Sequence, residues 1–211
     1  MKNSWQILTL LLAVALFALS IKVVFQKENQ SAPLDKGAVI VDNIMTRSSV
    51  RNYTSQPVEQ EKIDILLKAG MAAPSAGNRQ PWSFIVIKDR EILDTLPNII
   101  KGAHMAAKSQ LAIVVCGRAI PQEGLLVPEY WVQDCAAATE NILLAAHGIG
   151  LGAVWCGAYP ENGSSRVEGM STLLNLPDDI FALNIIVIGY PEGETVVKDK
   201  WDASKVYYNR Y

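Results

Sequence analysis

The stretch from Pro74 to Gln80 gathers side chains that can bind the polar edge of a ring. It contains the hydroxyl of Ser75 and the carboxamides of Asn78 and Gln80, and it lies between two prolines that restrict the backbone. Each carboxamide offers a donor and an acceptor, which suits hydrogen bonding to a heterocycle. A solvated loop with a proline stop signal has the same composition, so this loop alone leaves both interpretations open.

A second group of polar residues precedes this loop in the chain. Arg47 and Arg51 are four positions apart, with Ser48 and Ser49 between them. Two guanidinium groups, hydroxyl donors and a local turn together suit a phosphate group. Two surface arginines beside a serine-rich turn give the same pattern, so this segment also needs support from the rest of the chain.

Apolar patterns indicate the elements that position these two groups. The loop follows a helical pattern over residues 60–71 and precedes a short apolar strand over 83–87. Because the strands are few and separated by helices, the pattern predicts α/β or α+β architecture with one sheet. Further strands are expected at residues 111–116, 153–157 and 183–188, and helices at 39–45, 89–107, 130–147 and within 160–176.

Glycines follow the strongest helical pattern, at residues 148, 150 and 152. A Gly-x-Gly-x-Gly string can suggest a dinucleotide-binding loop, but that fingerprint requires a strand before it and a helix after it. Here the order is reversed, which excludes this interpretation. Residues 153–157 instead predict a strand that ends in a turn, where backbone N–H groups could face a ligand.

Composition excludes several classes of function. The chain has 211 residues and a formal net charge of −2, which gives no basic footprint for nucleic acid. Its two histidines show no metal-ligand spacing, so we predict no metal site. The three cysteines lie in apolar patterns and are expected to be small buried residues.

The N-terminal segment has a different character from the rest. Lys2 precedes an apolar run from Ile7 to Ile21, which predicts a secretory signal or a membrane anchor over residues 1–25, cleaved or retained. Residues 26–36 are polar and predict a linker. We therefore expect a folded domain over residues 37–211, held at or exported across a membrane on its extracytoplasmic face.

Four segments, taken in their order along the chain, resemble the flavin-dependent nitroreductase family. They cover the chain from about residue 39 to residue 211, and they are residues 47–53, residues 74–82, residues 150–155, and residues 189–191 with the basic tail that follows. The resemblance implies an α+β fold with a central, mostly antiparallel sheet flanked by helices. It also implies a homodimer with FMN at the subunit interface.

The resemblance assigns a role to each group of polar residues. Arg47, Ser49 and Arg51 match contacts to the FMN phosphate and ribityl chain, and Ser48 stands where many members have a second arginine. Lys200 matches the basic residue of the family's C-terminal tail. The cofactor-binding residues that we predict are Arg47, Ser48, Ser49, Arg51, Pro74, Ser75, Ala76, Asn78, Gln80, Asp134, Trp155, Cys156, Gly157 and Lys200.

Within this set, Asn78 is the expected contact to the edge of the flavin ring. Cys156 and Gly157 match the turn whose backbone N–H approaches N5, the atom that accepts the hydride, and Asp134 falls near a polar flavin contact. The chemistry then belongs to the cofactor, so no catalytic side chain is expected.

The resemblance implies reduction of nitroaromatics, quinones or similar acceptors by NAD(P)H, with ping-pong hydride transfer through N5. An exported protein meets little free NAD(P)H, so a different electron donor, such as a membrane partner, stays open. Two alternatives remain: a non-catalytic FMN-binding protein held at the membrane, and a reductive dehalogenase-like enzyme of the same fold. An anchored structural domain that has lost its cofactor is a third, simpler hypothesis.

Overall fold

The computed structural model describes residues 35–119, 130–159 and 165–211, together with Trp5, Leu11, residues 13–17 and Lys22. The chain divides into two compact units, residues 1–42 and 43–211. The predicted signal or anchor and the predicted linker lie mostly outside the described residues. Among the described residues, no helix combines the length and the hydropathy that crossing a bilayer requires.

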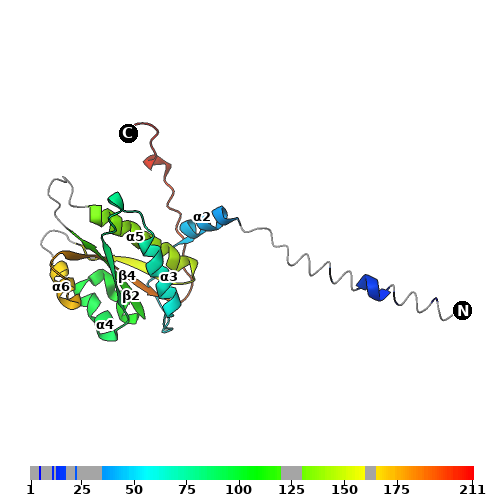
Figure 1. Cartoon of the computed structure of the whole chain (residues 1–211), viewed down its shortest axis with the longest axis horizontal. Helices are drawn as coiled ribbons and strands as arrows, with labels where there is room; N and C mark the ends of the chain where they lie inside the picture. Colours follow the sequence, from blue (N-terminus) through cyan, green and yellow to red (C-terminus); the bar gives the residue numbers. More distant parts are fainter. Residues whose placement is uncertain are drawn as a thin grey trace. The chain divides into compact units, whose positions relative to one another are not determined.

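One antiparallel sheet of four strands forms the centre of the second unit (Figure 1). Its spatial order is β1-β2-β4-β3, so β1 and β3 are the two edge strands. The sequence prediction of four strands is confirmed, with each observed strand one to four residues longer than the predicted one. The strands are β1 Trp82–Ile87, β2 Leu111–Arg118, β3 Gly152–Gly157 and β4 Ile180–Gly189.

Helices cover both faces of this sheet, which makes the fold α+β as expected (Figure 1). The covering helices are α3 Gln60–Met71, α4 Arg90–Ile99, α5 Tyr130–Gly148 and α6 Ser165–Leu174, with the 3₁₀ segment η2 Lys101–Lys108. Helix α2 Lys36–Thr46 spans the boundary of the two units, and two further 3₁₀ segments are η1 Ala76–Asn78 and η3 Ala203–Lys205.

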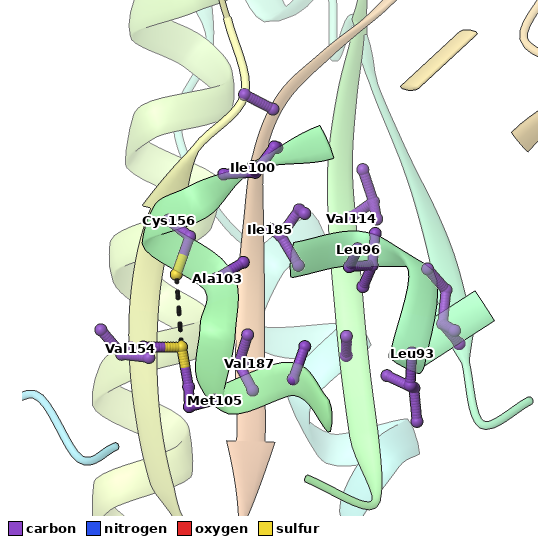
Figure 2. Close-up of a cluster of buried hydrophobic side chains, with 14 of the residues drawn as sticks. Leu93, Leu96, Ile100, Ala103, Met105, Val114, Val154, Cys156, Ile185 and Val187 are labelled. Atoms are coloured by element: carbon purple, nitrogen blue, oxygen red, sulfur yellow. Dashed lines mark hydrogen bonds between the residues drawn. The ribbon is translucent and has the colours of Figure 1, made fainter. Parts of the chain in front are cut away.

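Each face of the sheet buries its own apolar cluster, because side chains alternate between the two faces of a strand. On one face, α4, η2 and α6 pack Leu96, Met105 and Met170 against the sheet. Figure 2 shows this cluster, with Val114 and Ile185 of the two central strands beneath α4 and η2. On the other face, α3 and α5 pack against the sheet through a separate cluster.

The expected continuous helix over residues 89–107 is wrong in its second half. Helix α4 ends at Ile99, and Ile100 is extended, with φ −122° and ψ 96°. Pro97 lies in the last turn, where it supplies no N–H for the helical ladder. Ile100 is only 2% exposed, so its burial draws the chain out of the helix before η2 begins as a 3₁₀ segment.

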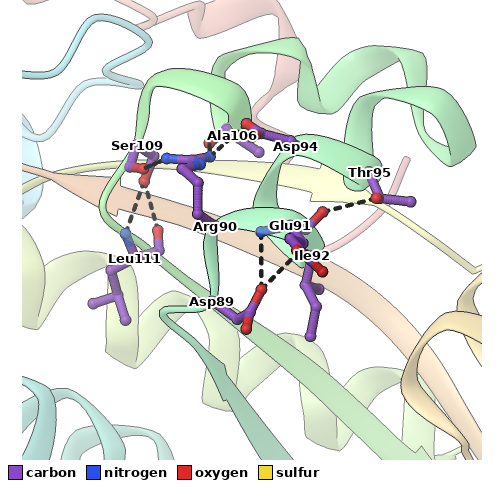
Figure 3. A network of polar contacts seen from close by, with 9 residues as sticks. All are labelled: Asp89, Arg90, Glu91, Ile92, Asp94, Thr95, Ala106, Ser109 and Leu111. Carbon is purple, nitrogen blue, oxygen red and sulfur yellow. Dashed lines mark hydrogen bonds and ion pairs between the residues drawn. The ribbon is translucent and has the colours of Figure 1, made fainter.

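Polar contacts join α4 to the end of η2 (Figure 3). The Asp89 carboxylate caps α4 by accepting from the N–H groups of Glu91 and Ile92, at 2.8 and 3.2 Å. Arg90 donates to the carbonyl oxygens of Ser109 and Ala106, at 2.7 and 2.9 Å. The Arg90 contacts join α4 to the last turn of η2 and to Ser109 just after it, while the Asp89 cap satisfies two N–H groups at the start of α4.

The pairing of β2 with β4 contains a bulge. Val115 faces Asn184 but the next residue, Cys116, faces Ala182, so Leu183 is left over on β4. Such an extra residue bends its strand and redirects the neighbouring side chains.

Candidate functional site

The edge of β3 presents backbone donors to the outside of the sheet. The N–H of Ala158 donates to the Leu183 carbonyl at 3.0 Å, while Gly157 lies opposite Asn184. Hydrogen-bonded and non-hydrogen-bonded pairs alternate along an antiparallel ladder. Because Ala158 donates to Leu183, the preceding pair, Gly157 and Asn184, is a non-hydrogen-bonded pair. Such pairs alternate, so the N–H groups of Trp155 and Gly157 point away from β4 toward the edge.

An independent contact supports this assignment of directions. The carbonyl of Ala153, two residues before Trp155, accepts from the N–H of Val50 at 3.0 Å on the outer side of β3. Ser49 forms an isolated parallel bridge with Ala153. The predicted phosphate-binding segment therefore joins the same edge of the sheet that carries the outward donors of β3.

Two arginines bring positive charge to this edge. Arg51 is exposed, and its charge lowers the pKa of the Cys156 thiol, while burial is the larger effect and raises that pKa to about 11. Arg47 lies with its Nε 3.8 Å from Oε1 of Glu140 on α5, and its side chain is 16% exposed. The two guanidinium groups thus flank the segment that approaches β3.

The side chains of Trp155 and Cys156, which are adjacent on β3, point to opposite faces of the sheet. The Cys156 thiol lies in the α4–η2 core, 3.3 Å from the Gly102 carbonyl and 3.8 Å from Sδ of Met105 (Figure 2). Trp155 stays 38% exposed on the other face. The Cys156 side chain therefore packs in the core, and by the same alternation its backbone N–H faces β4, which leaves Gly157 as the predicted donor at the outer edge.

The predicted ring-binding loop is stabilised by its own polar side chains. The Ser75 hydroxyl accepts from the N–H of Gln80 at 3.0 Å, and the Gln80 carboxamide donates to Oδ1 of Asn78 at 2.8 Å. Gly77, Asn78 and Gln80 all have positive φ, at 59°, 55° and 49°. Asparagine tolerates this conformation better than most residues, so the loop is held in one defined shape.

Asp134 on α5 fixes this loop to the helix. Its Oδ1 accepts from the N–H of Ala76 at 2.9 Å, and the residue is only 7% exposed. The structure therefore gives Asp134 a role in positioning the loop, where the sequence comparison suggested a contact to the flavin.

One copy of the chain holds these two groups of residues at separate corners of the sheet. The loop leads into β1, at one edge, and Ser49 lies beside β3, at the other. Trp82 is in register with Gly117 of β2, whereas Ala153 is in register, through Ile188, with Leu111. Three strand spacings and six residues separate the corners by roughly 25 Å.

The remaining predicted residues lie in three places: the segment beside β3, the loop before β1 and the C-terminal tail. Ser48 is half-buried beside Arg47, and Pro74 is exposed in the loop. Lys200 lies in a C-terminal tail that is exposed from residue 192 to residue 211.

Sequence reasoning missed two residues next to the end of β3. Asn184 of β4 and Thr139 of α5 are both fully buried and bonded to each other, Nδ2 to Oγ1, at 2.9 Å. The available signal was a single asparagine inside the otherwise apolar run of β4. Tyr53 was also unassigned: its hydroxyl donates to the carbonyl of Val50 or Val187, at 2.5 and 3.0 Å, and so fixes the segment beside β3.

Comparisons with known sequences agree on one protein family. The sequence profile of the nitroreductase family matches residues 44–126 and 105–190. A Methanothermobacter thermautotrophicus protein, provisionally named NADH dehydrogenase/NAD(P)H nitroreductase, is 36% identical over 191 residues, covering 90% of this chain and 95% of its own. An Archaeoglobus fulgidus protein with the same provisional name is 44% identical over 160 residues, covering 76% of this chain and 88% of its own.

Solved structures show the same fold. A crystal structure from Parabacteroides distasonis, again provisionally named NADH dehydrogenase/NAD(P)H nitroreductase, superposes with a TM-score of 0.76 at 43% identity, covering 82% of this chain and 98% of that one. An FMN-dependent nitroreductase from Clostridium difficile superposes with a TM-score of 0.73 at 29% identity, covering 81% of this chain and 99% of that one.

Proposed function

This chain belongs to the nitroreductase family, and we propose that, as an FMN-dependent NAD(P)H oxidoreductase, it reduces nitroaromatics, quinones or similar small aromatic acceptors. The observation that carries the proposal is the outer edge of β3. There, outward N–H groups at Trp155 and Gly157 lie on the same edge as the Arg47–Arg51 segment.

The residues at this edge fit the two ends of FMN. Arg47 and Arg51, with the hydroxyls between them, offer charge-assisted hydrogen bonds to the phosphate. About four residues along β3, or roughly 13 Å, separate Ala153 from Gly157, whose N–H would face the ring. A Cβ added at Gly157 would meet nothing within 4 Å, so the backbone there is open to a flat ligand.

A second copy of the chain would complete the site. Because one copy keeps its 74–80 loop and its β3 edge at different corners, we propose a homodimer in which each loop reaches the edge of the partner. A two-fold interface uses the same surfaces on both copies and forms two such sites. The exposed apolar side chains of the tail offer surface for this contact: Val196, Val197, Trp201, Tyr207, Tyr208 and Tyr211.

When bound, FMN supplies the chemistry by taking a hydride at N5 from NAD(P)H and passing electrons on to the acceptor in a ping-pong cycle. The protein's part is to bind and orient. The outward N–H groups of β3 would hold the ring edge, the arginines would hold the phosphate, and Asn78 of the loop would face the remaining ring edge.

The test is the visible spectrum of the purified full-length chain. We expect a bound-flavin absorption band that NADH or NADPH bleaches under argon and that a quinone or a nitroaromatic restores. A flavin that stays oxidised with both nicotinamides would instead support the non-catalytic FMN-binding alternative. A colourless chain that also takes up no added FMN would contradict the proposal.

A further inference from the structure

Asn184 has a buried carbonyl oxygen without a donor. The residue is 0% exposed, and its Oδ1 is the one buried side-chain oxygen or nitrogen in the described part of the chain that has no hydrogen-bond partner. A buried acceptor left in this state destabilises the folded chain. Such a group in a native protein calls for an explanation.

The neighbours of Asn184 fix the orientation of its amide. The Thr139 hydroxyl lies 2.7 Å from the Cys135 carbonyl, to which it donates its only proton. The same oxygen can therefore only accept from Asn184, and the group facing it must be the NH₂, at 2.9 Å. Oδ1 is directed away from that contact with α5.

The position of Asn184 connects this amide to the proposed flavin site. It lies opposite Gly157, the last residue of β3, and directly follows the bulge residue Leu183. The Leu183 carbonyl accepts from the N–H groups of Ala158 and Tyr159, at 3.0 and 2.9 Å. The bulge thus determines where the chain leaves β3, and it places the Asn184 residue opposite Gly157 at that point.

Gly157 itself leaves room beside this amide. On the face covered by α5, a side chain at position 157 would be the cross-strand neighbour of Asn184. Glycine provides none, and the space at its Cβ position is open to 4 Å. The polar pair therefore lies beneath a backbone segment with little packing of its own.

We propose that Asn184, anchored by Thr139, is a positioning residue that holds the Gly157 backbone in the orientation the flavin ring requires. The inference rests on the proposed function, because it assigns these residues to the same FMN site. The inference explains why the chain keeps a buried oxygen that lowers its stability: the amide serves the site. It also adds to the site one residue of β4 and one of α5, neither of which needs to touch the cofactor.

The test uses the double variant Asn184→Leu/Thr139→Val, which replaces both partners by apolar groups with the same number of heavy atoms. Removing a poorly satisfied buried pair in this way is expected to leave the apo-protein as stable as the wild type or more stable in urea. We expect the Kd for FMN to rise about tenfold and the absorption band of bound flavin to change. The single variant Thr139→Val, which only removes the anchor, should weaken FMN binding in the same direction.

Asn141→Leu is the matched control. Asn141 is a half-buried asparagine on α5, and its Nδ2 donates to the Ala69 carbonyl at 3.0 Å, between α5 and α3. This variant should change unfolding in urea without changing the Kd for FMN. A control that weakens FMN binding as much as the double variant would overturn the inference.

The outcomes separate the two proposals. If the wild type binds FMN and the double variant binds it with unchanged Kd and spectrum, Asn184 is merely structural and only this inference fails. If the wild type takes up no FMN, the proposed function fails and the inference fails with it. If the double variant does not fold, Thr139→Val decides alone, and an unchanged Kd there overturns the inference.

Discussion

On the face of the sheet covered by α4 and η2, the carbonyls at the end of η2 have a donor in Arg90, and the core side chains are fully buried. On the face covered by α5, at the end of β3, a buried amide oxygen lacks a donor, a glycine leaves open space and backbone N–H groups point outward. The first region satisfies its own groups, whereas the second leaves groups for a ligand.

This difference indicates how the two regions divide their work. Regions that hold a ligand commonly give up some stability, whereas a face that only packs has no such requirement. Substitutions on the α4–η2 face should therefore change unfolding and leave binding alone. Substitutions at the β3 edge should do the reverse.

The largest effect is expected for Leu96→Ala on the α4–η2 face. Leu96 is 0% exposed, so its truncation leaves a cavity and should lower the free energy of unfolding by about 2–5 kcal/mol, measured in urea. Ile65→Ala, at a position 45% exposed on α3, serves as the control and should cost far less. The Kd for FMN of the folded Leu96→Ala protein should match the wild type, and a large rise would break the comparison.

Arg51→Ala should have an intermediate effect, on binding alone. Removing this exposed guanidinium should raise the Kd for FMN about 10- to 100-fold, because a charge-assisted contact to phosphate is lost. The free energy of unfolding should change by no more than about 0.5 kcal/mol. Arg166→Ala removes the same charge from an exposed position on α6, and fluorescence titration with FMN should find it unchanged.

The smallest expected effect is the change of stability with pH that the three buried cysteine thiols cause, and it tests the core region of the comparison. Burial raises the pKa of Cys116 and Cys135 from 9.0 to about 12, and that of Cys156 to about 11. Between 9 and these values the unfolded chain binds fewer protons than the folded chain, so stability falls as pH rises. Raising the pH from 8 to 9 should lower the free energy of unfolding by about 1 kcal/mol in total.

Urea unfolding at pH 7, 8 and 9 measures this loss, which should be negligible between pH 7 and 8. At pH 8 a thiol reagent should modify the native chain slowly and the unfolded chain rapidly. Fast modification of Cys156 in the native protein would show that its thiol reaches the site and would contradict its placement in the core.

Much of the fold followed from local patterns. Short apolar runs such as residues 111–116 and the long helix over 130–147 were predicted with nearly correct bounds, because burial on both faces leaves a continuous apolar signal. The break after Ile99 was missed, since Pro97 lies in a last turn where a helix tolerates it and the burial of Ile100 is a tertiary effect.

The candidate site likewise has features that the local sequence predicts and features that depend on the tertiary structure. The chain itself specified the residue types for a phosphate and for a ring edge, since guanidinium groups, hydroxyls and carboxamides are local chemistry. Tertiary structure decided the rest. Strand register placed Ser49 beside Ala153, turned the Cys156 thiol into the core and placed Asn184 opposite Gly157, and the packing of α5 beside the loop brought Asp134 to the N–H of Ala76. Register depends on partners far apart in the sequence and on a bulge, and one strand's pattern contains neither.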